Sequence, residues 1–64
     1  MNNDLLKYLS KQVQEEVDVI QRDLALGKAS DYGDYKFSCG MVRGLLIANN
    51  ILMETSERMK ENDE

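Results

Sequence analysis

The residues best suited to chemistry in this sequence include two aspartates near its middle. Asp31 and Asp34 stand three positions apart, a spacing that puts both carboxylates on one side of a helix. Such a pair could hold a divalent cation or share a proton. A helix N-terminus explains them more simply, because acidic side chains there cap free N–H groups and offset the helix dipole. We therefore expect Ser30 or Asp31 to cap a helix, with no metal bound.

The one cysteine has no partner for catalysis. The chain contains a single cysteine and no histidine, which excludes a thiolate–imidazole pair or a zinc site within one chain. Gly40 and Gly44 lack the following Lys-Ser/Thr of a phosphate-binding loop. We interpret Cys39 as a small apolar residue of an interface. The sequence predicts a protein that is not an enzyme and needs no cofactor.

The net charge and the length of the apolar run limit the kinds of partner that the chain can bind. The 64 residues carry a net charge of −4, and acids accompany most of the scattered bases, which disfavours nucleic-acid binding. The uncharged run on either side of Arg43 is shorter than the ~20 apolar residues of a membrane span. Arg43 should reach solvent along its stem or meet a carboxylate, since an unpaired buried charge is costly. A single thiol and the absence of a signal-peptide pattern predict a reducing, intracellular compartment.

The elements that hold these residues are two helices. A first helix, from about residue 3 to 26, is predicted by an apolar line with spacings of 3, 4, 4, 3 and 4: Leu6, Leu9, Val13, Val17, Ile20 and Leu24. Gly27 is a helix stop, residues 27–30 form a turn, and a second helix spans about 31 to 60. So short a turn makes the helices antiparallel neighbours. The prediction is an all-α fold, one two-helix hairpin over residues 1–64.

The second helix is apolar on two opposite sides. One side carries the small residues Gly40, Gly44 and Ala48, whose size lets another helix approach closely, and we predict that it packs against the first helix. The other side is a seam with spacings of 4, 3, 4, 3 and 4: Tyr35, Cys39, Val42, Leu46, Asn49 and Met53. With Arg43, this seam is the predicted interface with another molecule. Alternatively, this side simply lies under a partner's surface with Asn49 at the edge.

A hairpin of this length buries too little apolar surface to be stable alone. We therefore expect it to be completed by a second copy, as a dimer or higher oligomer, or by docking on a larger protein. The predicted function is then that of a structural or interaction protein. A small acidic regulator that binds and inhibits a host protein is the alternative.

The middle of the chain resembles small helical-hairpin proteins of tailed, podovirus-like bacteriophages, which share the pattern D-Y-x-x-Y-K-x-x-C-G-x-x-R-G-L-x-x-A. The matching residues are Asp31, Tyr32, Tyr35, Lys36, Cys39, Gly40, Arg43, Gly44, Leu45 and Ala48. The resemblance implies a phage origin and a virion role at the head, portal or tail, with a larger phage protein as partner. It places the chain in the host cytoplasm during assembly and carries over no catalytic residues.

Overall fold

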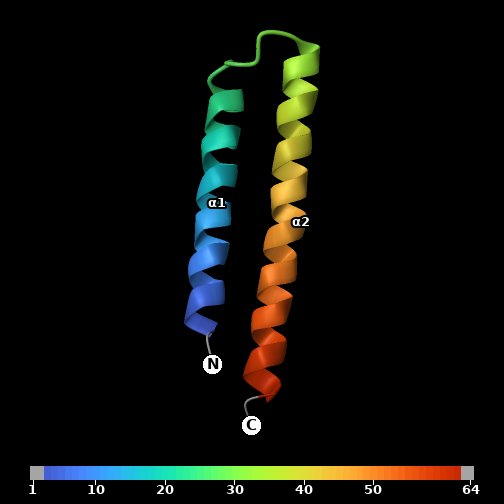
Figure 1. Cartoon of the computed structure of the whole chain (residues 1–64). Coiled ribbons are helices and arrows are strands. Elements are labelled where there is room, and N and C mark those ends of the chain that lie inside the picture. Colours follow the sequence, from blue (N-terminus) through green and yellow to red (C-terminus); the bar gives the residue numbers. More distant parts are fainter. Residues whose placement is uncertain (1–2, 63–64) are drawn as a thin grey trace.

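The structure is a hairpin of two antiparallel helices. A computed structural model describes residues 3–62, in which α1 spans Asn3–Ala25 and α2 spans Tyr32–Asn62. The two helices lie side by side along nearly their whole length, joined by one short connection (Figure 1). The molecule is elongated, with extents of 51 × 14 × 11 Å. The predicted all-α hairpin is confirmed.

The side of α1 that faces α2 is an apolar line with one polar member. Val17, at its middle, is the only fully buried apolar side chain among the described residues, with 1% of its surface exposed. Leu9, which the sequence pattern included, is 40% exposed, and Ser10 takes its place in the half-buried row. The row has spacings of 4, 3, 4, 3 and 4, which is a coiled-coil repeat: Leu6, Ser10, Val13, Val17, Ile20 and Leu24.

Gly27 ends α1 as expected. Its φ of +77° lies in the left-handed region, which glycine adopts without steric cost. The Gly27 N–H donates to the Leu24 carbonyl, and the Lys28 N–H donates to the Asp23 carbonyl, both at 3.0 Å. This is a Schellman motif, which satisfies carbonyls that the helix end would leave free. The Lys28 ammonium also lies 3.3 Å from the Asp23 carboxylate.

Substituting Gly27→Ala should lower the free energy of unfolding by about 1–2 kcal/mol, the cost of left-handed backbone for a residue with a Cβ. The added methyl meets nothing within 4 Å, so backbone strain is the only expected cause. Thermal unfolding measures the effect. Gly33→Ala is the control, because Gly33 has a helical φ and an added Cβ there comes no closer than 3.4 Å to the Asp31 carboxylate. An equal loss of unfolding free energy in both variants would contradict the conclusion that the left-handed backbone of Gly27 is the cause.

The start of α2 uses the two aspartates as a capping pair. The Asp31 Oδ1 accepts the Asp34 N–H at 2.8 Å, and the Tyr35 N–H donates to the Asp31 carbonyl at 3.0 Å. The Asp34 carboxylate in turn accepts the Ser30 hydroxyl and, at 3.3 Å, the Ser30 N–H. Hydrogen bonds from Ser30, first from its side chain and then from its backbone, lower the pKa of Asp34 below its ordinary value. Asp31 therefore caps the helix, as the sequence allowed.

This capping pair should make the hairpin sensitive to acid. A carboxyl whose pKa is lowered in the folded state stabilises it fully above the ordinary aspartate pKa of about 3.9. That stability is lost as the pH falls through the lower, folded pKa. Melting temperatures from pH 6 to 2 should show a drop at the acid end that is smaller in Asp34→Asn, whose side chain has no carboxyl to titrate. If the melting temperatures of the parent and of Asp34→Asn fall by the same amount between pH 6 and 2, the ionised Asp34 carboxylate does not stabilise the fold.

Candidate interaction surfaces

A polar cluster sits in the middle of the contact between the helices. Asn49 is buried, with 8% of its surface exposed. Its Oδ1 accepts the Ser10 hydroxyl, and its Nδ2 donates to the Gln14 Oε1 at 3.5 Å. Because a buried amide without partners is costly, these contacts favour one register of α2 against α1. A polar residue at a heptad position in each helix was the sequence signal for this cluster.

The side of α2 that faces α1 differs from the prediction. The half-buried and buried residues of α2 include a row with spacings of 4, 3, 4, 3, 4 and 3: Ser38, Val42, Leu45, Asn49, Leu52, Ser56 and Met59. Assigning Val42 and Asn49 to a surface turned away from the first helix was therefore wrong. Half-buried Cys39 borders the same row. The physical reason is the hydrogen-bonding requirement of Asn49, which Ser10 and Gln14 meet from within the chain.

The small residues of α2 face solvent in the hairpin. Gly40, Gly44 and Ala48 are all exposed, and a Cβ added at either glycine meets nothing within 4 Å. The prediction that they pack against the first helix is wrong, because α1 lies against the larger side chains of the row through Asn49. Glycine inside a helix costs about 1 kcal/mol relative to alanine. Within the hairpin, nothing compensates that cost at Gly40 or Gly44.

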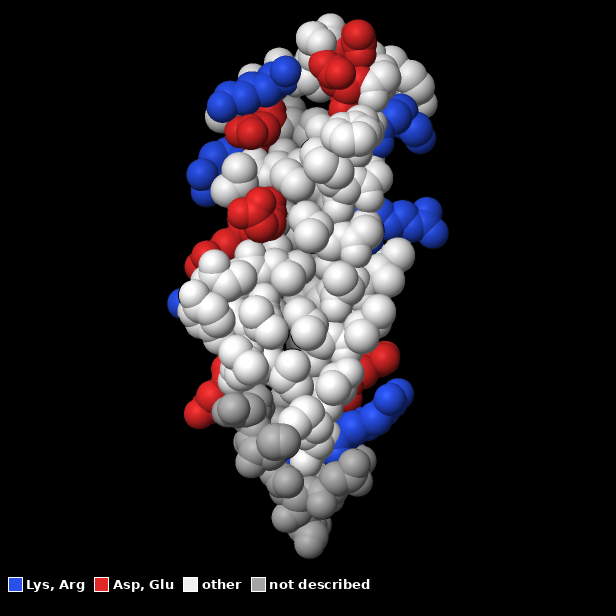
Figure 2. Space-filling model, in the orientation of Figure 1, with Lys and Arg blue, Asp and Glu red and all other residues white. Residues whose placement is uncertain are grey.

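These small residues belong to an exposed apolar surface, which we call the glycine-side surface: Phe37, Gly40, Met41, Gly44, Ile47, Ala48 and Ile51. Phe37 is 68% exposed and Ile51 is 57% exposed. At its upper end, Phe37 and Met41 line a shallow hollow of about 330 Å³ with Asp23 of α1. Figure 2 shows one face of the hairpin on which uncharged side chains cover most of the area and charged ones gather at the edges.

A second exposed surface lies on the other flank of α2, and we call it the tyrosine-side surface: Tyr35, Leu46 and Met53. Leu46 is 44% exposed and Met53 is 55% exposed. A hydrogen bond with the neighbouring Cys39 side chain, and then the negative charge that this sulfur carries when ionised, raise the pKa of Tyr35. These three residues are accessible, as an interface requires, and their role as one stays a prediction. Arg43 is also exposed, which agrees with the expectation that it reaches solvent.

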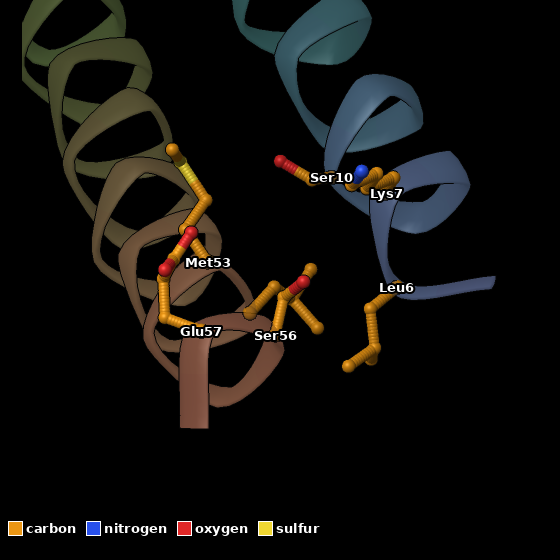
Figure 3. Close-up of a pocket in the computed structure, with 7 residues that line it drawn as sticks. Leu6, Lys7, Ser10, Met53, Ser56 and Glu57 are labelled. Atoms are coloured by element: carbon orange, nitrogen blue, oxygen red, sulfur yellow. The ribbon is translucent and has the colours of Figure 1, made fainter. Parts of the chain in front are cut away.

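A small hollow at the open end of the hairpin lies between the helices (Figure 3). It measures about 180 Å³, below the roughly 300 Å³ of a typical small-molecule site. Its lining is Leu6, Lys7, Ser10, Leu52, Met53, Ser56 and Glu57. In Figure 3 the side chains of Lys7 and Glu57 do not converge on one point, so the hollow lacks the arrangement that binds a charged ligand.

Within residues 3–62, no group of three His, Cys, Asp or Glu side chains is placed to hold a metal ion. In the same range, neither helix is both long and apolar enough to cross a membrane. What the described residues do offer is two apolar flanks of one long helix. Comparisons with models of protein families, with curated proteins and with solved structures each find no match to this chain.

Proposed function

We propose that this chain is a non-enzymatic structural or interaction protein that works by packing its exposed helix faces against another polypeptide. The observation that supports this most directly is its accessible surface of 5054 Å². A monomeric protein of 7.3 kDa is expected to expose roughly 4,200 Å². The chain therefore carries about 900 Å² more surface than a finished monomer of its mass.

Large apolar side chains contribute to the exposed surface. Besides Val17, no apolar side chain among the described residues is fully buried, and many large ones are more than half exposed. Contiguous apolar patches of this kind on soluble proteins mark sites of interaction. A partner that covers them would contribute the burial that the hairpin lacks.

The resemblance of residues 31–48 to small phage hairpins leads us to propose a virion component, associated with the head, portal or tail. The alternative is an acidic regulator, favoured by the net charge of −4, which would bind a host protein. Mass spectrometry of purified particles and of the cleared lysate separates the two. A virion component is enriched with the particles at a constant ratio to the other virion proteins. Recovery only from the lysate would overturn the virion role.

A further inference from the structure

We infer that the glycine-side surface is a docking site for a second copy of this chain, with the two α2 helices antiparallel and crossing at Gly44. This inference rests on the proposed function and names its first partner. The surface lies about 100° around α2 from the side that faces α1. A second α2 can therefore reach it without disturbing the hairpin.

The pattern of residue sizes fits a helix of the same sequence. Phe37, Met41, Gly44, Ala48 and Ile51 follow one another at spacings of 4, 3, 4 and 3, which is a coiled-coil repeat. An antiparallel copy centred on Gly44 sets Phe37 beside the partner's Ile51 and Gly40 beside the partner's Ala48. Large side chains then meet large ones, small residues meet small ones, and the two backbones approach closely where glycine leaves room. This explains the open space at Gly44, which the hairpin itself does not use.

One pair of opposite charges, Lys36 and Glu54, fits the same arrangement. Lys36 and Glu54 stand eighteen positions apart, which is five whole turns of a helix, so they lie at the same angle around α2. The midpoint between them is Leu45, next to the proposed crossing point. An antiparallel copy brings Lys36 opposite the partner's Glu54, and symmetry makes this pair twice. A parallel copy would set the two Lys36 side chains on opposite flanks of the contact, and no Lys36–Glu54 pair would form.

The excess surface of the chain is similar in size to one side of an ordinary dimer contact. The excess of about 900 Å² per chain compares with the roughly 800 Å² that each partner buries in a stable protein–protein interface. One additional contact of standard size would thus bury an area equal to the excess accessible surface of the chain. Because the contact is two-fold symmetric, it closes on itself and needs no third copy.

The first test is the oligomeric state of the full-length chain. Sedimentation equilibrium from about 1 to 100 μM should show a folded dimer, because these concentrations lie at or above the dissociation constants usual for interfaces of this size. Gly44→Glu should raise the dissociation constant by about 100-fold or more, because it sets two carboxylates at the symmetry axis in a desolvated contact. Asn50→Glu is the matched control. It adds the same charge to an exposed position on another side of α2, and should change the constant by less than about 3-fold. Leu46→Glu tests the tyrosine-side surface instead.

The second test needs no substitution that could affect folding. A zero-length carbodiimide cross-linker joins an amine directly to a carboxylate, and should connect Lys36 to Glu54 in the dimer. These residues are about 27 Å apart along one helix at 1.5 Å per residue, so the product can form only between two chains. Mixing ¹⁵N-labelled with unlabelled chain should give cross-linked peptides of mixed mass. Lys36→Arg keeps the charge but removes the reactive amine, and should abolish this product without dissociating the dimer.

A folded monomer at 100 μM would overturn the inference, as would a dimer without the Lys36–Glu54 product. A dimer weakened by Leu46→Glu but not by Gly44→Glu would also overturn it and assign the contact to the tyrosine-side surface. Failure here is distinct from failure of the proposed function. A monomer that is nonetheless enriched in particles keeps the structural role, whereas a dimer found only in lysate keeps this interface and loses the virion role.

Discussion

The variant Val17→Asp should not fold. Val17 is the one apolar side chain among the described residues with almost no exposed surface, and it lies midway along the row that faces α2. Replacing it removes an apolar side chain and buries a carboxylate with no cation provided to pair it, which costs several kcal/mol. A chain of this length has only a few kcal/mol of stability. The expected result is a circular dichroism spectrum of an unfolded chain at 25 °C.

Val19→Asp is the matched control, two positions further along the same helix. The side chain of Val19 is 47% exposed, so a carboxylate there stays hydrated. The two variants have the same composition and the same net charge, and differ only in which side of α1 carries the aspartate. We expect Val19→Asp to keep its helical spectrum and to lose less than about 1 kcal/mol, as is usual for a surface position. Equal unfolding of both variants would contradict the packing of α1 on α2.

The variant Asn49→Ala should lower the free energy of unfolding by about 1–3 kcal/mol, the usual cost of leaving buried hydrogen-bonding groups without a partner. The truncation leaves the Ser10 hydroxyl and the Gln14 amide oxygen without the amide that they contact. Chemical denaturation measures the loss. Asn50→Ala is the control, because Asn50 is exposed and alanine favours the helix, so its stability should stay level or rise slightly.

A double-mutant cycle shows whether the polar cluster acts as a unit. In the Asn49→Ala background, adding Ser10→Ala should cost little, because the hydroxyl has already lost its acceptor there. In the parent, Ser10→Ala alone should cost more. Residues that share a hydrogen bond show coupling of about 0.5–3 kcal/mol in such cycles. Additive losses would mean that Ser10 and Asn49 do not interact, and that the register of the hairpin is set by apolar packing alone.

Much of the fold was predictable from local signals in the sequence. Gly27 ends the first helix because only glycine adopts a φ of +77° without strain, and the capping pair Asp31 and Asp34 starts the second. Between these signals, apolar residues recur at helical spacing and the connection is short, which makes the two helices antiparallel neighbours. Signals of this kind act over a few residues, so they can be identified before any tertiary contact is known.

The tertiary structure decided which side of α2 meets α1. The sequence shows apolar residues nearly all round this helix, and its small residues suggested a close contact along Gly40, Gly44 and Ala48. A helix with more than one apolar side has no single orientation that burial alone selects. The amide of Asn49 settles the choice, because it needs buried partners and finds them thirty-five and thirty-nine positions away, in Gln14 and Ser10. Contacts between residues so far apart in the sequence depend on the register between the helices, which no local pattern specifies. With α1 packed on the row through Asn49, the glycine-side surface stays free for a second chain.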